Sequence, residues 1–170
     1  MSQLGSAPVP PAGRDDHLRG TATAPLVIEY ADLECPYCAA VHRRLVALPV
    51  RLLFRHFPVR SSHPRAWAAA CAAEAAAAQG RFWEMHDALL DDQARLEDPH
   101  LWRRAQQLGL DLERFDVQRR SEPVLERVRR DFHTGIRAGV VTTPALFAMS
   151  APGALAVRVD EAELQRQLDF

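Results

Sequence analysis

The chain has 170 residues, of which 48% are hydrophobic and 25% are charged, and its formal net charge is −1. This balance is typical of one globular domain, and the near-zero charge excludes the strongly basic surface of proteins that bind nucleic acid or anionic membranes. Three cysteines are too few for a disulfide scaffold, so their pattern points to redox or metal chemistry.

The N-terminal residues lack the basic and apolar segments of a secretory signal, and no later run reaches the roughly 20 apolar residues of a membrane span. We therefore expect a cytoplasmic location. A periplasmic one would need a start site upstream of the given sequence. Residues 1–20, rich in proline and small residues at first, predict a tail that is partly disordered or forms an edge strand.

The first regular elements predict a β-α-β unit over residues 21–60. Residues 26–31 are apolar apart from Glu29 and predict a buried strand. The residues after Cys35 have helical spacing, and residues 50–57 predict a second strand. A strand, a helix and a strand of these lengths place the two strands parallel in one sheet.

Residues 61–139 predict helices almost throughout. Pro64 opens an alanine-rich helix, Asp98 and Pro99 open a second, and a glycine closes each of them. Ser121 can cap a third, in which apolar residues recur at helical spacing as far as Ile136.

Residues 140–170 return to strand patterns. Residues 145–149 and 155–159 are strand-like and are separated by a turn sequence, and a final helix starts at Asp160. The whole order is β-α-β, a helical insertion, then β-β-α, which indicates an α/β fold in one structural domain.

The motif Cys35-Pro36-Tyr37-Cys38 lies between the first strand and the first helix. Free N–H groups and the dipole at a helix N-terminus favour a thiolate at Cys35, and proline suits the first helical position. Cys38 follows one turn later, so the two sulfurs can meet. The motif therefore predicts a reversible disulfide that needs no bound cofactor.

Zinc is the alternative for this motif. A zinc site requires about four ligands, and only Cys71, His42 or His56 could complete it, none at a typical spacing. We expect no metal. Cys71, in an apolar helix, is predicted to be a small buried hydrophobe.

Two further positions bear on the predicted disulfide. Glu29 is either a half-buried acid that holds or passes the Cys38 proton, or an acid at a strand edge that is solvated or paired with an arginine. Thr143-Pro144 precedes a strand, where proline predicts a tight bend, with a cis peptide as one option.

Blocks spread over most of the chain, from about Asp16, resemble the DsbA-like thiol–disulfide oxidoreductases of the thioredoxin superfamily. These blocks are residues 24–38, residues 54–58 with the helices after them, and residues 139–144. The resemblance implies a thioredoxin-like fold with a helical insertion between its two halves.

The resemblance also implies roles for individual residues. Cys35 would be the exposed nucleophile and Cys38 the resolving thiol, and Glu29 would be the buried acid that assists proton transfer. The substrate would meet Pro36, Tyr37, Thr143 and Pro144.

These observations predict an enzyme that exchanges disulfides with proteins or small thiols. We expect a monomer, with a dimer as the alternative, and no nucleic-acid or membrane partner. Tyr37 stands where strongly oxidising periplasmic members have a histidine, and Glu34 adds negative charge. We therefore expect a less acidic Cys35 thiol and a less oxidising Cys35–Cys38 redox couple. The alternatives are a redox-sensing or protein-interaction module with little turnover and a glutaredoxin-like reductase, which the long helical insertion opposes.

Overall fold

The structure is a computed structural model that describes residues 6–168 of the chain, so residues 1–5 of the predicted tail lie outside the described residues. The strands are β1 (His17–Arg19), β2 (Leu26–Ala31), β3 (Arg51–His56), β4 (Ala145–Ala148) and β5 (Val157–Val159). The helices are α1 (Pro36–Leu45), α2 (Ala66–Ala77), α3 (Phe82–Asp91), α4 (Asp98–Gln107), α5 (Leu112–Gln118), α6 (Glu122–Arg137) and α7 (Glu161–Leu168).

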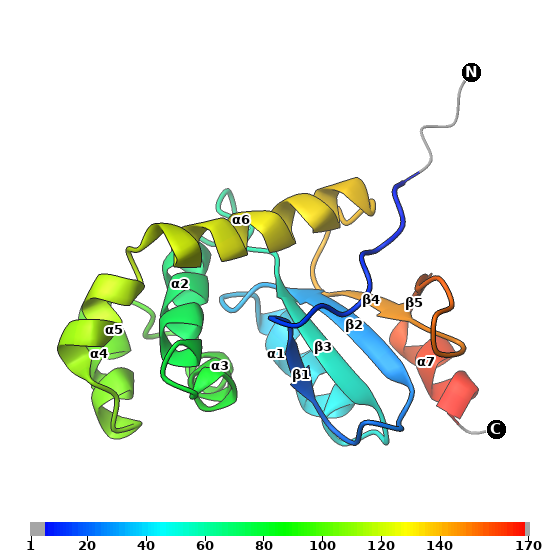
Figure 1. Ribbon diagram of the computed structural model, residues 1–170, viewed down its shortest axis with the longest axis horizontal. Coiled ribbons are helices and arrows are strands. Elements are labelled where there is room, and N and C mark those ends of the chain that lie inside the picture. The colour runs from blue at the N-terminus through cyan, green and yellow to red at the C-terminus, as the bar shows by residue number, and fades with distance from the viewer. Residues whose placement is uncertain (1–5, 169–170) are drawn as a thin grey trace.

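The strands form one sheet in the order β1-β3-β2-β4-β5. The central strands β2 and β3 run parallel, joined through α1, while β1, β4 and β5 pair antiparallel with their neighbours. This order confirms the predicted β-α-β and β-β-α units on either side of a helical block (Figure 1).

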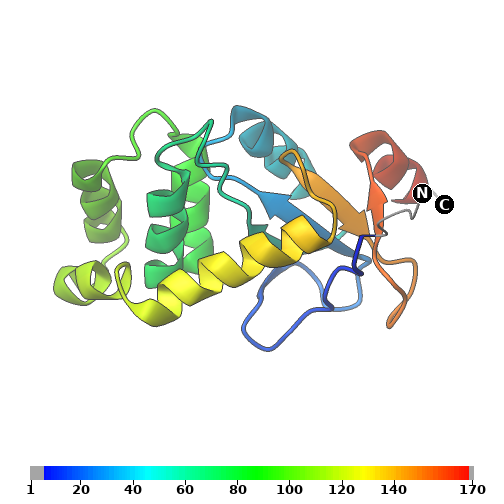
Figure 2. The ribbon, with the colours of Figure 1, turned by 90° about the horizontal axis from the view of Figure 1, so that it is seen from above.

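Helices cover both faces of the sheet (Figures 1 and 2). Alternate residues of β2 serve the two faces, as the period of two in a strand requires. Ile28 and Tyr30 pack with residues that include Phe132 of α6. Val27 packs on the opposite face, with residues of α1 and α7.

Helix α6 approaches the sheet closely at Gly135. A Cβ atom there would come within 2.6 Å of the Phe57 ring and 3.0 Å of Tyr30. The stripe of α6 that is buried runs through Val128 and Gly135, and Ile136 lies about 100° further round the helix. Ile136 is therefore 51% exposed, and the prediction that it belongs to the apolar face is wrong.

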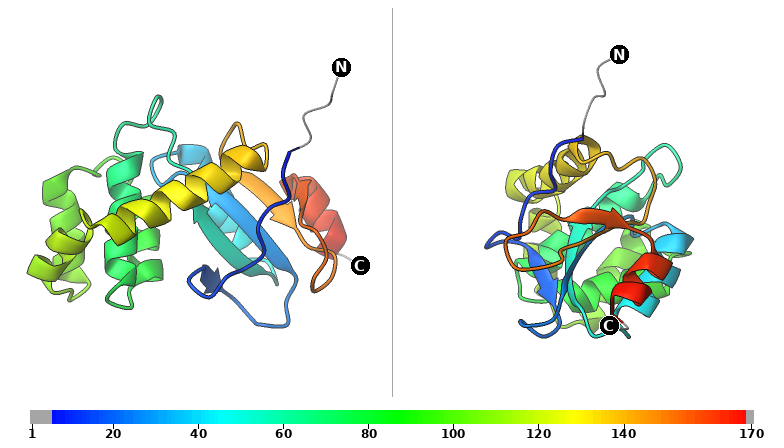
Figure 3. Two further views of the ribbon diagram at one scale, coloured as in Figure 1. Left: turned by 45° about the horizontal axis from the view of Figure 1, so that its top comes forward. Right: turned by 90° about the vertical axis from the view of Figure 1, so that its right-hand side faces the viewer.

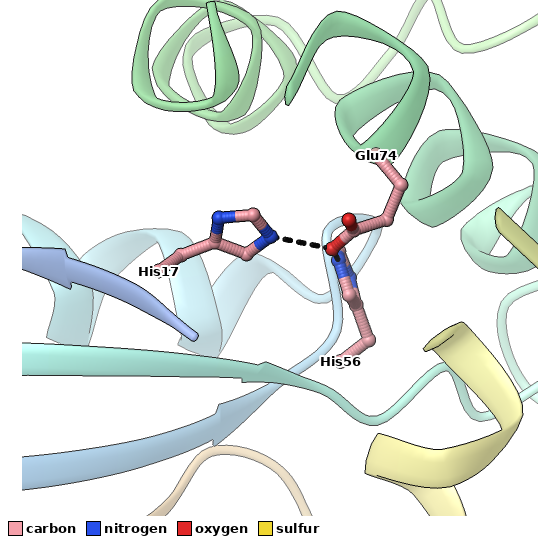
Figure 4. A group of neighbouring side chains, drawn as sticks. All are labelled: His17, His56 and Glu74. Carbon is pink, nitrogen blue, oxygen red and sulfur yellow. Dashed lines mark hydrogen bonds and ion pairs between the residues drawn. The ribbon is translucent and has the colours of Figure 1, made fainter. Parts of the chain in front are cut away.

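Helices α2 to α5 form a block at one end of the sheet (Figure 3). A cluster of His17, His56 and Glu74, named here the Glu74 cluster, ties α2 to β1 and β3 (Figure 4). Trp83 of α3 adds a hydrogen bond from its indole Nε1 to the backbone carbonyl of Leu18, 3.1 Å away. The block is thus attached to the sheet through polar groups as well as through its core.

Local details differ from the sequence prediction. Ser121 is the N-cap of α6, but its hydroxyl donates to the Gln118 carbonyl and makes no side-chain cap hydrogen bond. The last strand is shorter than expected, because only the three residues of β5 pair with β4, and Leu155 is left exposed. Among the described residues, no helix combines the length and apolarity needed to cross a bilayer.

Candidate active site

Cys35 is the N-cap of α1, and Pro36 is the first residue of that helix. Cys38 follows one turn later, and both cysteines are thiols. Cys35 is only 3% exposed, so the expectation of an exposed nucleophile is wrong. Its sulfur lies 3.8 Å from the backbone carbonyl of Thr143, to which the thiol donates, while Pro36 and Tyr37 are exposed beside it.

The two thiols differ in acidity. The side chain of Cys38, together with the backbone N–H of Cys38 and the side chain of Thr143, hydrogen-bonds the Cys35 sulfur and lowers the pKa of Cys35 from 9.0 to about 5, although burial works in the opposite direction. Burial raises the pKa of Cys38 far above its usual value. Cys35 is therefore the thiolate at neutral pH, and Cys38 keeps its proton.

Asp32, in the loop between β2 and α1, is an acidic residue whose backbone is hydrogen-bonded to Cys38. Its backbone N–H donates to the Cys38 sulfur across 3.4 Å. Its carboxylate accepts from the backbone N–H of Glu34 and of Val59 at 2.8 and 2.7 Å, and from His63 Nδ1 at 2.9 Å. All of these bonds hold the loop, and the sequence prediction did not include Asp32, although it directly follows β2.

Gln93, which follows α3, supports the same loop from the helical block. Its Nε2 donates to the carbonyl of Leu33 at 3.0 Å and to that of Cys35 at 2.9 Å. Two carbonyls of the active-site loop thus accept hydrogen bonds from a residue that lies 60 and 58 positions further along the chain.

Glu29 lies on the central strand β2 and is 1% exposed, so it is fully buried, not half-buried, and it is not at a strand edge. Its partner is a histidine instead of an arginine. His42 Nδ1 of α1 lies 2.7 Å from Glu29 Oε2. His42 is one turn after Cys38, so Cys38 and His42 share a face of α1.

Glu34 is directed away from the thiols. One of its carboxylate oxygens accepts from the backbone N–H of Arg65 at 2.7 Å, and the guanidinium of Arg65 lies 3.6 Å from the other. The groups that shift the pKa of Cys35 most are its hydrogen-bond partners in α1 and Thr143.

The Thr143–Pro144 peptide bond is cis. Both residues line a groove of about 510 Å³ that runs along α1 and the start of α7. Tyr37, 74% exposed, lies on its rim. The other lining residues are Ala40, Val41, Arg44, Ala145, Leu146, Arg158, Val159, Asp160 and Glu161.

The residues considered for zinc lie in three different environments. His42 meets Glu29, and His56 meets Glu74. Cys71 is buried against Val124 and Val128, and burial raises its pKa to about 11. None of the three is brought to the Cys35–Cys38 pair as a ligand set.

Comparison with known proteins supplies a family match over nearly the whole chain. A family model described as "Thioredoxin" matches residues 13–169. A thioredoxin-like oxidoreductase from Silicibacter pomeroyi superposes with a TM-score of 0.77 at 25% identity, covering 92% of each chain. DsbA2 of Pseudomonas aeruginosa gives 0.72 at 26% identity, covering 94% of each chain.

The curated relatives with similar sequences are larger proteins. The chain is 46% identical over 138 residues to the Na(+)/H(+) antiporter NhaA 3 of Salinispora tropica, and 42% identical over 141 residues to an NhaA 1 of Mycolicibacterium vanbaalenii. Each match covers 78% of this chain but only 21% and 23% of those proteins. The chain therefore spans about a fifth of the length of these relatives.

Proposed function

The chain belongs to the thioredoxin family, and from that premise we propose that its Cys35–Cys38 pair exchanges disulfides with protein substrates. Its fold is the predicted α/β thioredoxin-like fold with a helical insertion, as in DsbA-like proteins. Fold and cysteine pair together make it a thiol–disulfide oxidoreductase in general terms. The substrate, the roles of the residues and the direction of electron flow are proposals.

One observation carries the proposal: two adjacent thiols of opposite acidity at the start of α1. The pKa of Cys35 is about 5, whereas burial raises that of Cys38. Disulfide exchange needs a thiolate to attack and a low-pKa sulfur to leave, and Cys35 suits both tasks. Cys38 then resolves the mixed disulfide by attacking the Cys35 sulfur.

The groove beside Cys35 supports an extended peptide as substrate. We assign substrate contacts to Tyr37, Thr143 and Pro144, which line this groove, and to Pro36, which is exposed next to Cys35 in the chain. An exposed tyrosine offers a large rigid contact area at little entropic cost. Strand-like docking beside Thr143 would use backbone hydrogen bonds and so would tolerate many sequences.

The acidity of Cys35 supports an intermediate reduction potential for the Cys35–Cys38 redox couple. Its pKa of about 5 lies between the values of about 3.5 for DsbA and about 7 for thioredoxin. A more acidic nucleophile stabilises the reduced state, so we expect a potential between about −270 and −120 mV. A redox titration against glutathione measures it.

Insulin reduction by dithiothreitol tests the mechanism directly. C35S is expected to abolish catalysed reduction, and C38S to accumulate a mixed disulfide that mass spectrometry detects. C71S is the matched control, because Cys71 is buried away from the pair, and it should retain the wild-type rate. Wild-type activity in C35S would refute the mechanism.

The antiporter relatives favour a second candidate, a redox-sensing module with little turnover. The chain is 46% identical over 138 residues to a part of a protein named as a Na(+)/H(+) antiporter, and it covers 21% of that protein. A redox-active segment joined to a protein of another activity would fit a sensor. Turnover separates the two functions. An enzyme reduces many equivalents of insulin per molecule, whereas a sensor is oxidised once and stops.

A cytoplasmic monomer without a bound cofactor is the setting that we propose for this cycle. Rapid alkylation of intact cells, followed by mass analysis, reads the oxidation state of the pair. Mostly free thiols agree with a cytoplasmic location, and a predominant disulfide contradicts it. Light scattering of the purified chain distinguishes a monomer from a dimer.

A further inference from the structure

Glu29 and His42 form a buried pair that has one polar atom without a partner at each end. Both side chains are almost fully inaccessible, and Glu29 Oε2 and His42 Nδ1 are 2.7 Å apart. Glu29 Oε1 and His42 Nε2 are buried and have no hydrogen-bond partner within residues 6–168. Unpaired buried polar atoms are costly, so their presence at both ends of one pair calls for a role.

The pair shares helix α1 with the resolving thiol. Cys38 lies one turn before His42 on the same face of α1 and is completely buried, so its proton needs an acceptor before the sulfur can attack. Asp32 is bonded to Cys38 through its backbone, but donors already occupy both of its carboxylate oxygens. Glu29 Oε1 is the carboxylate oxygen that is free to take a proton.

The other end of the pair leads to the surface. His42 Nε2 lies 3.9 Å from Oδ1 of Asp87 on α3, and the Asp87 side chain is 43% exposed. This separation is too long for a direct hydrogen bond, but one water or a small rotation closes it. Two further groups face Asp87: His86 Nδ1 at 2.9 Å and the guanidinium of Arg19, on β1, at 2.6 Å.

We propose that Glu29, His42 and Asp87 form a proton outlet for Cys38, with His42 and Asp87 as positioning residues of the exchange reaction. This inference rests on the proposed function. The Cys38 proton enters at Glu29 Oε1, one proton stays between Glu29 Oε2 and His42 Nδ1, and a proton leaves His42 Nε2 for Asp87 or water, so the pair holds the same number of protons before and after the step.

The accompanying bond changes balance. The Cys38 thiolate bonds to the Cys35 sulfur, the bond from Cys35 to the substrate sulfur breaks, and the substrate leaves as a thiolate. When a thiolate later opens the Cys35–Cys38 disulfide, Cys38 takes its proton back from Glu29 and His42 regains one from the surface.

His42, His86 and Asp87 also lie close enough together to hold a cation. The Arg19 guanidinium already neutralises Asp87 and brings a positive charge to the place that a cation would occupy. His86 is used in a hydrogen bond to the same carboxylate. The charge balance therefore favours proton transfer over metal binding.

The test separates the two chemical steps. Reduced protein is mixed with oxidised glutathione between pH 5 and 9 and quenched with acid, and mass spectrometry follows the mixed disulfide as it forms and decays. H42N keeps a donor toward Glu29 but has no group at the Nε2 position. D87N replaces the half-exposed carboxylate by a neutral amide, which also weakens its contacts with His86 and Arg19. H17N applies the same change to a histidine of the Glu74 cluster.

H42N and D87N should slow decay of the mixed disulfide about tenfold near neutral pH and alter its pH profile, while its formation is unchanged. H17N should match the wild type. Wild-type decay profiles in D87N, which remains informative if H42N does not fold, would overturn the outlet, as would a wild-type rate that responds to EDTA. If the wild type forms no mixed disulfide at all, the proposed function fails instead.

Discussion

Two buried clusters in this protein combine carboxylates with histidines, and they differ in the number of histidines that the carboxylate bonds. Each also contains a buried histidine nitrogen without a hydrogen-bond partner among the described residues, Nδ1 of His56 in one and Nε2 of His42 in the other. In the Glu74 cluster, Oε1 of Glu74 lies 2.7 Å from His17 Nε2 and 2.8 Å from His56 Nε2 (Figure 4). In the other cluster, Glu29 bonds His42 alone and keeps a free oxygen. The first joins the helical block to the sheet, and the second joins β2 to α1, the helix that carries Cys38.

The difference predicts which cluster contributes more to stability, and it agrees with the proton-transfer role proposed for Glu29. A carboxylate with two charge-assisted bonds is held firmly and costs much to remove. Glu29 is held by a single bond, and its second oxygen can accept a further donor. Composition alone does not distinguish the two, because each contains buried histidine and glutamate.

Glu74→Ala should produce the largest loss of stability. Without the carboxylate, His17 and His56 lose their common acceptor, and the free energy of unfolding should fall by about 3–5 kcal/mol. Urea denaturation measures the change. Glu84→Ala, at an exposed ion pair on α3, should change it by less than about 0.5 kcal/mol. A similar small loss in Glu74→Ala would make the two clusters equivalent.

Acid should weaken the same cluster. Burial alone would raise the pKa of Glu74, but hydrogen bonds from His17 and His56 outweigh it, and the pKa lies well below the usual 4.5. A lowered folded-state pKa stabilises the protein above pH 4.5, and that contribution is lost as the pH falls. The stability gap between wild type and E74Q should therefore narrow from pH 5 to pH 3. Parallel curves would contradict the assignment.

Glu29→Gln should cost less stability than Glu74→Gln. The amide oxygen can still accept from His42, and only one hydrogen bond is weakened, so about 0.5–1.5 kcal/mol is expected. Glu74→Gln weakens two charge-assisted bonds and should cost about 1.5–3 kcal/mol. Thermal unfolding of both variants at pH 7 orders them, and a reversed order would remove the distinction between the clusters.

The smallest expected effect is on thiol labelling. Replacing Glu74 by glutamine should leave the rate at which Cys35 is labelled unchanged. The rate of iodoacetamide labelling of Cys35 should rise around pH 5 in both the wild type and E74Q, since the groups that lower the pKa of Cys35 lie in α1 and at Thr143. Cys71, with a pKa of about 11, should stay unlabelled at pH 7. A shifted Cys35 profile in E74Q would couple the two regions.

The sequence predicted the parts of the site that depend on local geometry. Cys35, Pro36 and Cys38 occupy the expected cap, first position and first turn of α1, because capping and dipole effects act within a few residues. Glu29 was predicted near the pair, but its burial and its partner His42 depend on how α1 packs over β2. Periodicity carries no information about such packing.

Residues contributed by the helical block were the hardest to predict. Asp87 lies on α3, a helix for which we predicted no start or end of its own, and it meets His42 only through tertiary folding. The burial of Cys35 has the same origin, since Thr143 reaches its sulfur from a segment 108 residues away. No short motif links these positions.

The hydrogen bonds from Gln93 bear on how this architecture can be rearranged. They reach two carbonyls of the catalytic loop from within the inserted helices. If the insertion were removed to obtain a minimal domain, those carbonyls would lose the hydrogen bonds that Gln93 donates, and the loop would lose this support. The insertion therefore contributes to the structure of this loop. A shortened or grafted version of the domain must provide an equivalent amide donor at the same position.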